Sequence, residues 1–512
     1  MAQTRVDLLI KGGNVIARGR TSKHWIAVDG GKIVAIGSDG GWQPEAKTVV
    51  DATGKYVLPG VIDSEHHGSG ALGDVVLAET RAAISGGITT IGIEGHTVEF
   101  TKPPRSFPKR EEVGTYMDIL PNVLELERSN HILTDYFFTP GLSAWEHVKE
   151  MPALAEKYGI TSFKLRLHTK PGEHVWDMWR TMKAQGMYYY DDGLVYAAMR
   201  NVAALGPPAI LCLHCENWEI AYARRAELMA LGRSDPAAWD DMSPAFCEAG
   251  HIRTYAYYAK VTGCPILIRH TTCPESFEEI RRAKADGVDI TGNTNHCYFT
   301  FDKNTWRQNV PLRSSETFSA IWEAIKTGVI NSISSDNIFR AMSLETIEKS
   351  EKEHGPIAEV GARYPYDIFK GPGEIGRDSM AGRAESMLPV MLSEGVNKGR
   401  ISLARLVEVC CENPARIFGL YPRKGVIAVG SDADFTVVDL NKNLKLTRDH
   451  VFNSNGWSIW EGWQMKGWPV MTLLRGNIMM EWPEGEPKRR VVGEPIGKYL
   501  ARKPGHALYP VE

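Results

Sequence analysis

One short stretch constrains the fold of this chain more than any other. A Pro-Gly break at residues 59–60 is followed by two apolar residues and then by a run of acid and imidazole groups that ends at His67. Side chains alternate along a strand, so Asp63, Glu65 and His67 are expected on one face. If this strand opens an α/β barrel, its carboxyl end delivers Glu65 and His67 together to the face where barrel enzymes carry out their chemistry.

The region between residues 59 and 422 repeats a pattern of helix followed by short apolar strand, which is typical of α/β folds. Seven strands are predicted, at residues 61–67, 88–93, 162–167, 210–214, 265–270, 289–294 and 331–335. The helices that precede the last six are predicted at residues 77–86, 142–158, 194–205, 248–262, 276–286 and 318–327. Seven strands are one short of a (β/α)8 TIM-like barrel, and the eighth is expected between Asp336 and Pro422.

Both ends of the chain have a different pattern, of short strands broken by glycines. These strands are predicted at residues 7–10, 14–16, 25–29, 32–36, 48–51, 424–428, 435–439, 465–474 and 477–481. A small β-sandwich domain formed by both chain termini is the simplest interpretation. The expected division is a sandwich in residues 1–58 and 423–484, a barrel in 59–422, and a C-terminal oligomerisation arm in 485–512.

Composition excludes several classes of function. Of the 512 residues, 43% are hydrophobic and 24% are charged, which is ordinary for a globular protein. A formal net charge of −3 gives no electrostatic reason to expect nucleic acid or an acidic membrane as a partner, and no apolar run is long enough to cross a bilayer. Eight cysteines in so long a chain favour a reducing cytoplasm. Cys212 and Cys215 have C-x-x-C spacing, but no second pair lies at zinc-site spacing, so small buried thiols are expected.

Groups that can bind metals fall where the predicted barrel strands end. They are Glu65, His67, Lys164, His214, His270 and Asp336. Taken singly, a histidine at a strand end is often only hydrogen-bonded, a buried lysine can extend to the surface, and an aspartate can cap a turn. Six such groups on five predicted strands are harder to explain in this way, and together they predict a metal site.

Five motifs follow one another in a distinctive order. They are Pro-Gly-x-Ile-Asp at residues 59–63, Ser-Phe-Lys at 162–164, His-x-Glu-Asn at 214–217, the strand-ending His270, and Ser-Asp at 335–336. This order resembles the amidohydrolase superfamily and, within it, the dihydropyrimidinase and hydantoinase group of cyclic amidases. The resemblance runs nearly end to end and is especially close at residues 393–396, 413–422 and 466–470. It implies a TIM-like barrel and a homo-oligomer, commonly a tetramer.

The resemblance also implies a site with two divalent metals, zinc or manganese, bridged by a lysine carboxylated on its amine. Lys164 matches that lysine. His67 and Asp336 would bind the first ion, and His214 and His270 the second. A metal-bound hydroxide would attack the amide carbonyl, and Asp336 would pass its proton to the departing nitrogen.

Glu65 departs from this pattern, because the family's first motif is His-x-His and His66 points the other way along the strand. Three interpretations stay open. Glu65 could bind the first ion as a carboxylate, which favours manganese over zinc; the first site could be weak or empty, leaving a mononuclear enzyme; or Glu65 could carry a proton. His96, after the next strand, could supply a compensating imidazole, although a surface loop histidine is the simpler interpretation.

A second departure concerns the oxyanion that develops at the carbonyl. The family places a tyrosine five residues after the lysine, and here that position is Thr169. His168 is the candidate replacement donor. Asn309 stands where the family has a substrate-contacting serine, and its amide would suit an imide or ureide because it both donates and accepts hydrogen bonds.

Between Thr169 and Asp191 the chain is longer than the family pattern and rich in aromatic and methionine residues. One interpretation is an additional packed helix, because Trp176, Trp179 and Lys183 have helical spacing. The other is an active-site lid, which would favour a bulky or aromatic substrate.

The predicted function is a metal-dependent hydrolase that opens the C–N bond of a cyclic amide, imide or ureide. One alternative is a hydrolase of a linear amide or N-acyl compound on the same scaffold. The other is a non-catalytic interaction protein resembling the collapsin-response mediators, which keep the fold but have lost metal ligands.

Overall fold

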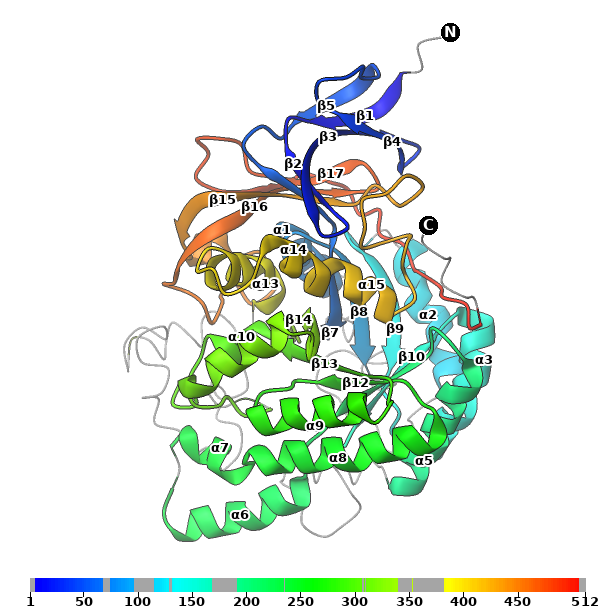
Figure 1. The fold of residues 1–512 in the computed structure, drawn as a ribbon, viewed down its shortest axis with the longest axis vertical. Helices are drawn as coiled ribbons and strands as arrows, with labels where there is room; N and C mark the ends of the chain where they lie inside the picture. The colour runs from blue at the N-terminus through cyan, green and yellow to red at the C-terminus, as the bar shows by residue number, and fades with distance from the viewer. Residues whose placement is uncertain are drawn as a thin grey trace.

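The computed structural model describes residues 5–67, 74–95, 115–128, 131–167, 191–233, 235–305, 308, 310–338, 352 and 382–505. Within these ranges the chain forms a barrel and a β-sandwich that lies against one end of it, above the barrel in the view of Figure 1. No described helix is both long and apolar enough to span a membrane.

The barrel has eight parallel strands in two hydrogen-bonded runs. The first run is β7 (Val61–His66), β8 (Ile88–Gly95) and β9 (Asp135–Pro140); the second is β10 (Ser162–Arg166), β11 (Ile210–His214), β12 (Ile266–Arg269), β13 (Ile290–Asn295) and β14 (Ile330–Ser334). Single bridges between Gly141 and Lys164 and between His66 and Asn337 close the two seams. The predicted (β/α)8 architecture is therefore confirmed.

Helices connect and cover these strands. Those described are α1 (Asp74–Ser85), α2 (Tyr116–Arg128), α3 (Trp145–Tyr158), α5 (Asp192–Leu205), α6 (Trp218–Ala230), α7 (Ala237–Met242), α8 (Ala245–Thr262), α9 (Pro274–Ala285), α10 (Phe318–Lys326), α13 (Arg383–Val390), α14 (Leu403–Val407) and α15 (Asn413–Ile417). In Figure 1, α8 and α9 lie along the outside of the barrel. Apolar strand residues such as Ile62, Phe137 and Leu267 form a buried cluster with Phe418, which follows α15.

Seven barrel strands lie within two residues of their predicted bounds, but the expected position of the eighth was wrong. That strand is β9, between β8 and β10, and not a segment after Asp336. Its six residues are all buried, but only three of them in succession, Tyr136 to Phe138, are apolar and the last is a proline, so the segment gives a weak strand signal.

The sandwich combines both ends of the chain. Its strands are β1 (Val6–Lys11), β2 (Asn14–Ala17), β3 (Arg20–Asp29), β4 (Lys32–Ser38), β5 (Ala46–Asp51), β6 (Tyr56–Pro59), β15 (Phe435–Lys445), β16 (Gln464–Leu474), β17 (Asn477–Glu481) and β18 (Arg490–Val491). Strand β6 joins the two contributions, because it pairs with β2 on one side and with β15 on the other. The sandwich formed by both termini is therefore confirmed.

The strand predicted at residues 424–428 was wrong, since no strand forms there. Instead Lys424 enters the interior, where its Nζ lies 2.6 Å from Asp135 and 2.9 Å from Asp432 and also pairs with Asp434. Asp135 opens β9 of the barrel, whereas Asp432 and Asp434 precede β15 of the sandwich. This buried lysine therefore ties the two domains together.

The described part of the C-terminal segment lies on this chain's own domains: Arg490–Val491 adds strand β18 to the sandwich, and the following residues lie on the barrel. Tyr499 forms a bridge with Tyr136 of β9, and the backbone of Arg502 donates to the carbonyl of Gly159. Its expected role in oligomerisation stays a prediction.

Candidate functional site

The barrel brings together the six residues that the sequence singled out. Glu65 lies at the end of β7 and His67 directly follows it, Lys164 lies in β10, His214 ends β11, His270 follows β12 and Asp336 follows β14. All six side chains are buried, and the most exposed, His67, has only 7% of its surface accessible. They come from the carboxyl ends of parallel strands, where barrel active sites lie.

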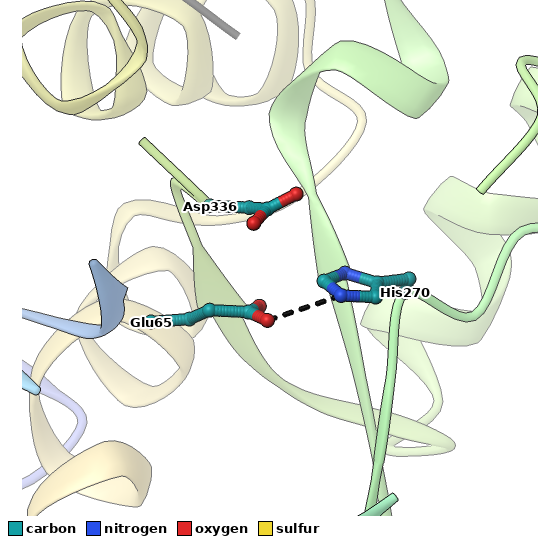
Figure 2. Close-up of side chains that lie close together, drawn as sticks. All are labelled: Glu65, His270 and Asp336. Carbon is teal, nitrogen blue, oxygen red and sulfur yellow. Dashed lines mark ion pairs between the residues drawn. The ribbon is translucent and has the colours of Figure 1, made fainter. Parts of the chain in front are cut away.

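Glu65 is the centre of their contacts. Its Oε1 lies 2.7 Å from Lys164 Nζ and 3.0 Å from His270 Nε2, and its Oε2 accepts a hydrogen bond of 3.0 Å from Ser334. Figure 2 shows the pair of Glu65 and His270 with Asp336 beside them. Burial alone raises the pKa of the Glu65 carboxyl, but the neighbouring His270, Lys164 and Arg269 hold it well below its usual value.

The imidazoles face the same centre. His67 Nε2 lies 3.2 Å from Asp336 Oδ1, and the rings of His214 and His270 meet edge to face with centroids 4.7 Å apart. His270 and Asp336 both have left-handed backbones, with φ of 55° and 52°. Left-handed backbones are uncommon outside glycine, even though Asp and His adopt them more often than most residues, and they often occur at functional sites.

Two further buried charges, which sequence reasoning missed, complete the contacts of Glu65. Glu94, in β8, pairs with Lys164 and with Arg269, the last residue of β12. Arg269 Nε in turn lies 3.9 Å from Glu65 Oε2. These four residues, which we call the charge ring, are each at most 2% exposed. The signal was present in the sequence, because Glu94 directly follows the strand predicted at residues 88–93 and lies two residues before His96.

Sequence reasoning also missed Glu216 and Arg383. Glu216 Oε2 lies 2.9 Å from His214 Nε2, and burial raises the pKa of its carboxyl to about 8. A carboxyl group that hydrogen-bonds one nitrogen of a histidine can orient the ring for metal binding through the other nitrogen. Arg383, at the start of α13, places one guanidinium nitrogen 3.4 Å from Asp336 Oδ2 and donates with the other to Gln308.

The donor set fits a divalent ion. Ligand atoms of Glu65, His270 and Asp336 lie within 4.8 Å of one another, and so do those of Glu65, His67 and Glu94. Carboxylate oxygens with imidazole nitrogens are a usual set for zinc or manganese. A third group of possible ligands consists of Asp135, Asp432 and Asp434. The ammonium of Lys424 lies among these carboxylates and balances their charge, so we do not assign a metal ion to them.

Several predicted residues lie outside the described part of the chain: His96, His168, Thr169, Asn309 and the stretch from residue 169 to 190. Their predicted roles therefore stay predictions. All eight cysteines are free and buried, as expected for Cys212 and Cys215.

Comparison with known proteins finds similarity to one family along nearly the whole chain. A model of the amidohydrolase family matches residues 244–479. L-hydantoinase of Paenarthrobacter aurescens is 28% identical over 513 residues, which are 97% of this chain and 98% of that protein. Allantoinase of Escherichia coli is 29% identical over 495 residues, 94% of this chain and 96% of that protein.

Solved structures agree with this match. The structure of L-hydantoinase (dihydropyrimidinase) from Arthrobacter aurescens superimposes with a TM-score of 0.78 at 27% identity, covering 97% of this chain and 100% of that one. The relatives thus match both domains and both termini over nearly their full length. Together these matches support an amidohydrolase-superfamily, hydantoinase-like protein.

Proposed function

We propose that this protein is a metal-dependent hydrolase that opens the C–N bond of a cyclic amide, imide or ureide and releases an open-chain acid. The observation that carries the proposal is the buried cluster of Glu65, His270 and Asp336 at the carboxyl end of the barrel, with ligand atoms within 4.8 Å of one another. The hydantoinase and allantoinase relatives, matched along nearly the whole chain, support the same reaction class.

The ligands would be Glu65, His67, His214, His270 and Asp336, holding one or two ions of zinc or manganese. Two of them have a supporting contact of their own, His214 to Glu216 and Asp336 to Arg383. A carboxylated Lys164 that bridges a second ion stays a prediction from the resemblance.

A bound divalent ion would supply acidified water and a Lewis acid for the carbonyl oxygen. The chain's own residues then move the proton. Asp336 Oδ1 faces the centre beside His67, so it can take a proton from the attacking water and deliver it to the departing ring nitrogen. Arg383 holds Oδ2 of the same carboxylate, which fixes its orientation. His168 as oxyanion donor and Thr169 and Asn309 as substrate contacts remain part of the proposal.

A bulky or aromatic substrate, a tetrameric assembly and a cytoplasmic location are further predictions of this proposal. A hydrolase of linear N-acyl compounds is the second candidate, because the same ion and base would serve an open-chain amide.

The test is a substrate panel on the purified chain. It contains hydantoin, 5-phenylhydantoin, dihydrouracil, allantoin and linear N-acyl amino acids, each assayed before and after removal of metal with a chelator. We expect metal-dependent ring opening, restored by zinc or manganese and strongly reduced in Asp336→Asn but not in the surface variant Asp286→Asn. Hydrolysis of the linear compounds alone would favour the second candidate. A folded chain that binds no ion and opens no ring would contradict the proposal.

A further inference from the structure

The contacts of Lys164 are those of an ammonium group. Nζ lies 2.7 Å from Glu65 Oε1 and also pairs with Glu94 Oε2. An ammonium offers three N–H donors, which is enough for both carboxylates. The side chain of Lys164 is 3% exposed and both glutamates are fully buried, so these ion pairs are shielded from solvent.

The charge ring is neutral as it stands. Glu65 and Glu94 carry two negative charges, Lys164 and Arg269 carry two positive charges, and the two signs alternate around the ring. Arg269 is anchored independently, because it donates to the side chain and the carbonyl of Ser64. Buried charges are tolerated when they are paired and hydrogen-bonded in this way.

Carboxylation would disrupt this arrangement. It would form a bond between Nζ and the carbon of carbon dioxide and release two protons from the ammonium, leaving one N–H. That single N–H could donate to only one of the two glutamates. The new carboxylate would lie next to both of them, with Arg269 as the only remaining cation of the ring.

The ammonium also lies where a first ion would need to bind. The second group of possible ligands, Glu65 with His67 and Glu94, uses the same two carboxylates that Lys164 already pairs with. The other group, Glu65 with His270 and Asp336, does not use Glu94 and leaves the pair of Lys164 and Glu94 intact. Among the described residues, an ion in the second group would therefore compete with Lys164 for both of its carboxylates, whereas an ion in the other group would share only Glu65 with it.

We propose that this protein has a one-ion centre in which Lys164 remains an uncarboxylated ammonium and Glu65 supplies the anionic charge that a lysine carbamate would otherwise provide. The single ion would be held by Glu65, His270 and Asp336, with His67 beside Asp336 and His214 beside His270. This inference rests on the proposed hydrolase function and sets the number and charge of its metal ligands.

The experiment measures the ions and the lysine separately, without an activity assay. The purified full chain is stripped of metal and reloaded with zinc or manganese, with and without ¹³C-labelled bicarbonate. Ions per chain are counted by elemental mass spectrometry, and ¹³C NMR reports any lysine carbamate. Lys164→Arg identifies the signal, because arginine forms no such carbamate, and Lys149→Arg on the exposed side of α3 is the matched control.

We expect one ion per chain, no carbamate signal, and the same loading with and without bicarbonate. Lys164→Arg, if folded by circular dichroism, is expected to keep its ion. A carbamate signal that Lys164→Arg abolishes, a second ion in the wild type, or loss of the ion from folded Lys164→Arg would each overturn the inference and leave the hydrolase function standing. Failure of the wild type to bind any ion would overturn both. If Lys164→Arg does not fold, the two wild-type measurements decide alone.

Discussion

Replacing Glu94 with glutamine tests whether the charge ring stabilises the barrel. The substitution keeps the shape of the side chain but changes the charge of the ring from zero to +1. The new amide would have one oxygen to accept from either Lys164 or Arg269, and its N–H groups would face the other cation. Removing one partner of a fully buried ion pair costs about 3–5 kcal/mol, and a domain has a free energy of unfolding of roughly 5–15 kcal/mol.

The assay is equilibrium unfolding in urea, followed by tryptophan fluorescence, with a chelator present so that metal binding does not contribute. Glu94→Gln is compared with the surface variant Asp7→Asn, whose carboxylate pairs with Lys47 in solvent and should change stability little. The double variant Glu94→Gln/Arg269→Met restores neutrality by leaving the pair of Glu65 and Lys164. Its loss of stability should fall short of the sum of the single losses by about 1–3 kcal/mol.

The reasoning is refuted if Glu94→Gln lowers the free energy of unfolding by less than about 1 kcal/mol, or if the two single substitutions are additive. Either result would mean that the four side chains do not form a buried network of alternating charge.

Three further predictions follow from other contacts. Arg383→Met should lower kcat about 10- to 100-fold with metal content unchanged, since a hydrogen bond to a charged group contributes about 1.5–3 kcal/mol. Steady-state kinetics measures this, with the exposed variant Arg281→Met as the control, and an unchanged kcat would contradict the prediction. Lys424→Met should destabilise the chain by about 3–5 kcal/mol, because it leaves three buried aspartates without their shared cation; a urea midpoint equal to that of wild type would disprove this. Burial raises the pKa of Glu385 to about 7, so the folded state holds a proton that the unfolded state releases near its ordinary pKa of 4.5. The contribution of this group to the free energy of unfolding therefore falls as pH rises from about 4.5 to 7. Between pH 4.5 and 8, the free energy of unfolding of Glu385→Gln should rise by about 3 kcal/mol relative to that of wild type. A difference between the two proteins that does not change with pH would show that Glu385 is not responsible.

The barrel and the six strand-end residues could be predicted because they depend on local pattern. The alternation of apolar strands and helices can be recognised in a single sequence. Because the barrel strands are parallel, residues at the carboxyl ends of these strands are expected at the same end of the barrel. Strand β9 was missed because it has only three apolar residues in succession and ends in a proline, which is rare inside strands. The prediction of a strand at residues 424–428 was wrong because Lys424 is paired with three carboxylates from two domains. Contacts between residues so far apart in the chain produce no periodic pattern in the sequence.

The charge ring illustrates the same limit inside the site. Alternation along β12 would place Arg269 and His270 on opposite faces, yet both contact Glu65. The left-handed backbone of His270 breaks the alternation, and a single φ value of this kind is set by packing and not by residue type.

The sequence by itself determined which kind of fold this chain adopts, which groups could bind an ion, and that Glu65 stands where a histidine was expected. Only the tertiary structure decided what Glu65 touches. Residues 65, 94, 164 and 269 are far apart along the chain, and their charges are balanced only when four strands bring them together in a buried space. The energy of a buried charge depends on its neighbours, and neighbours across a barrel are a property of the fold.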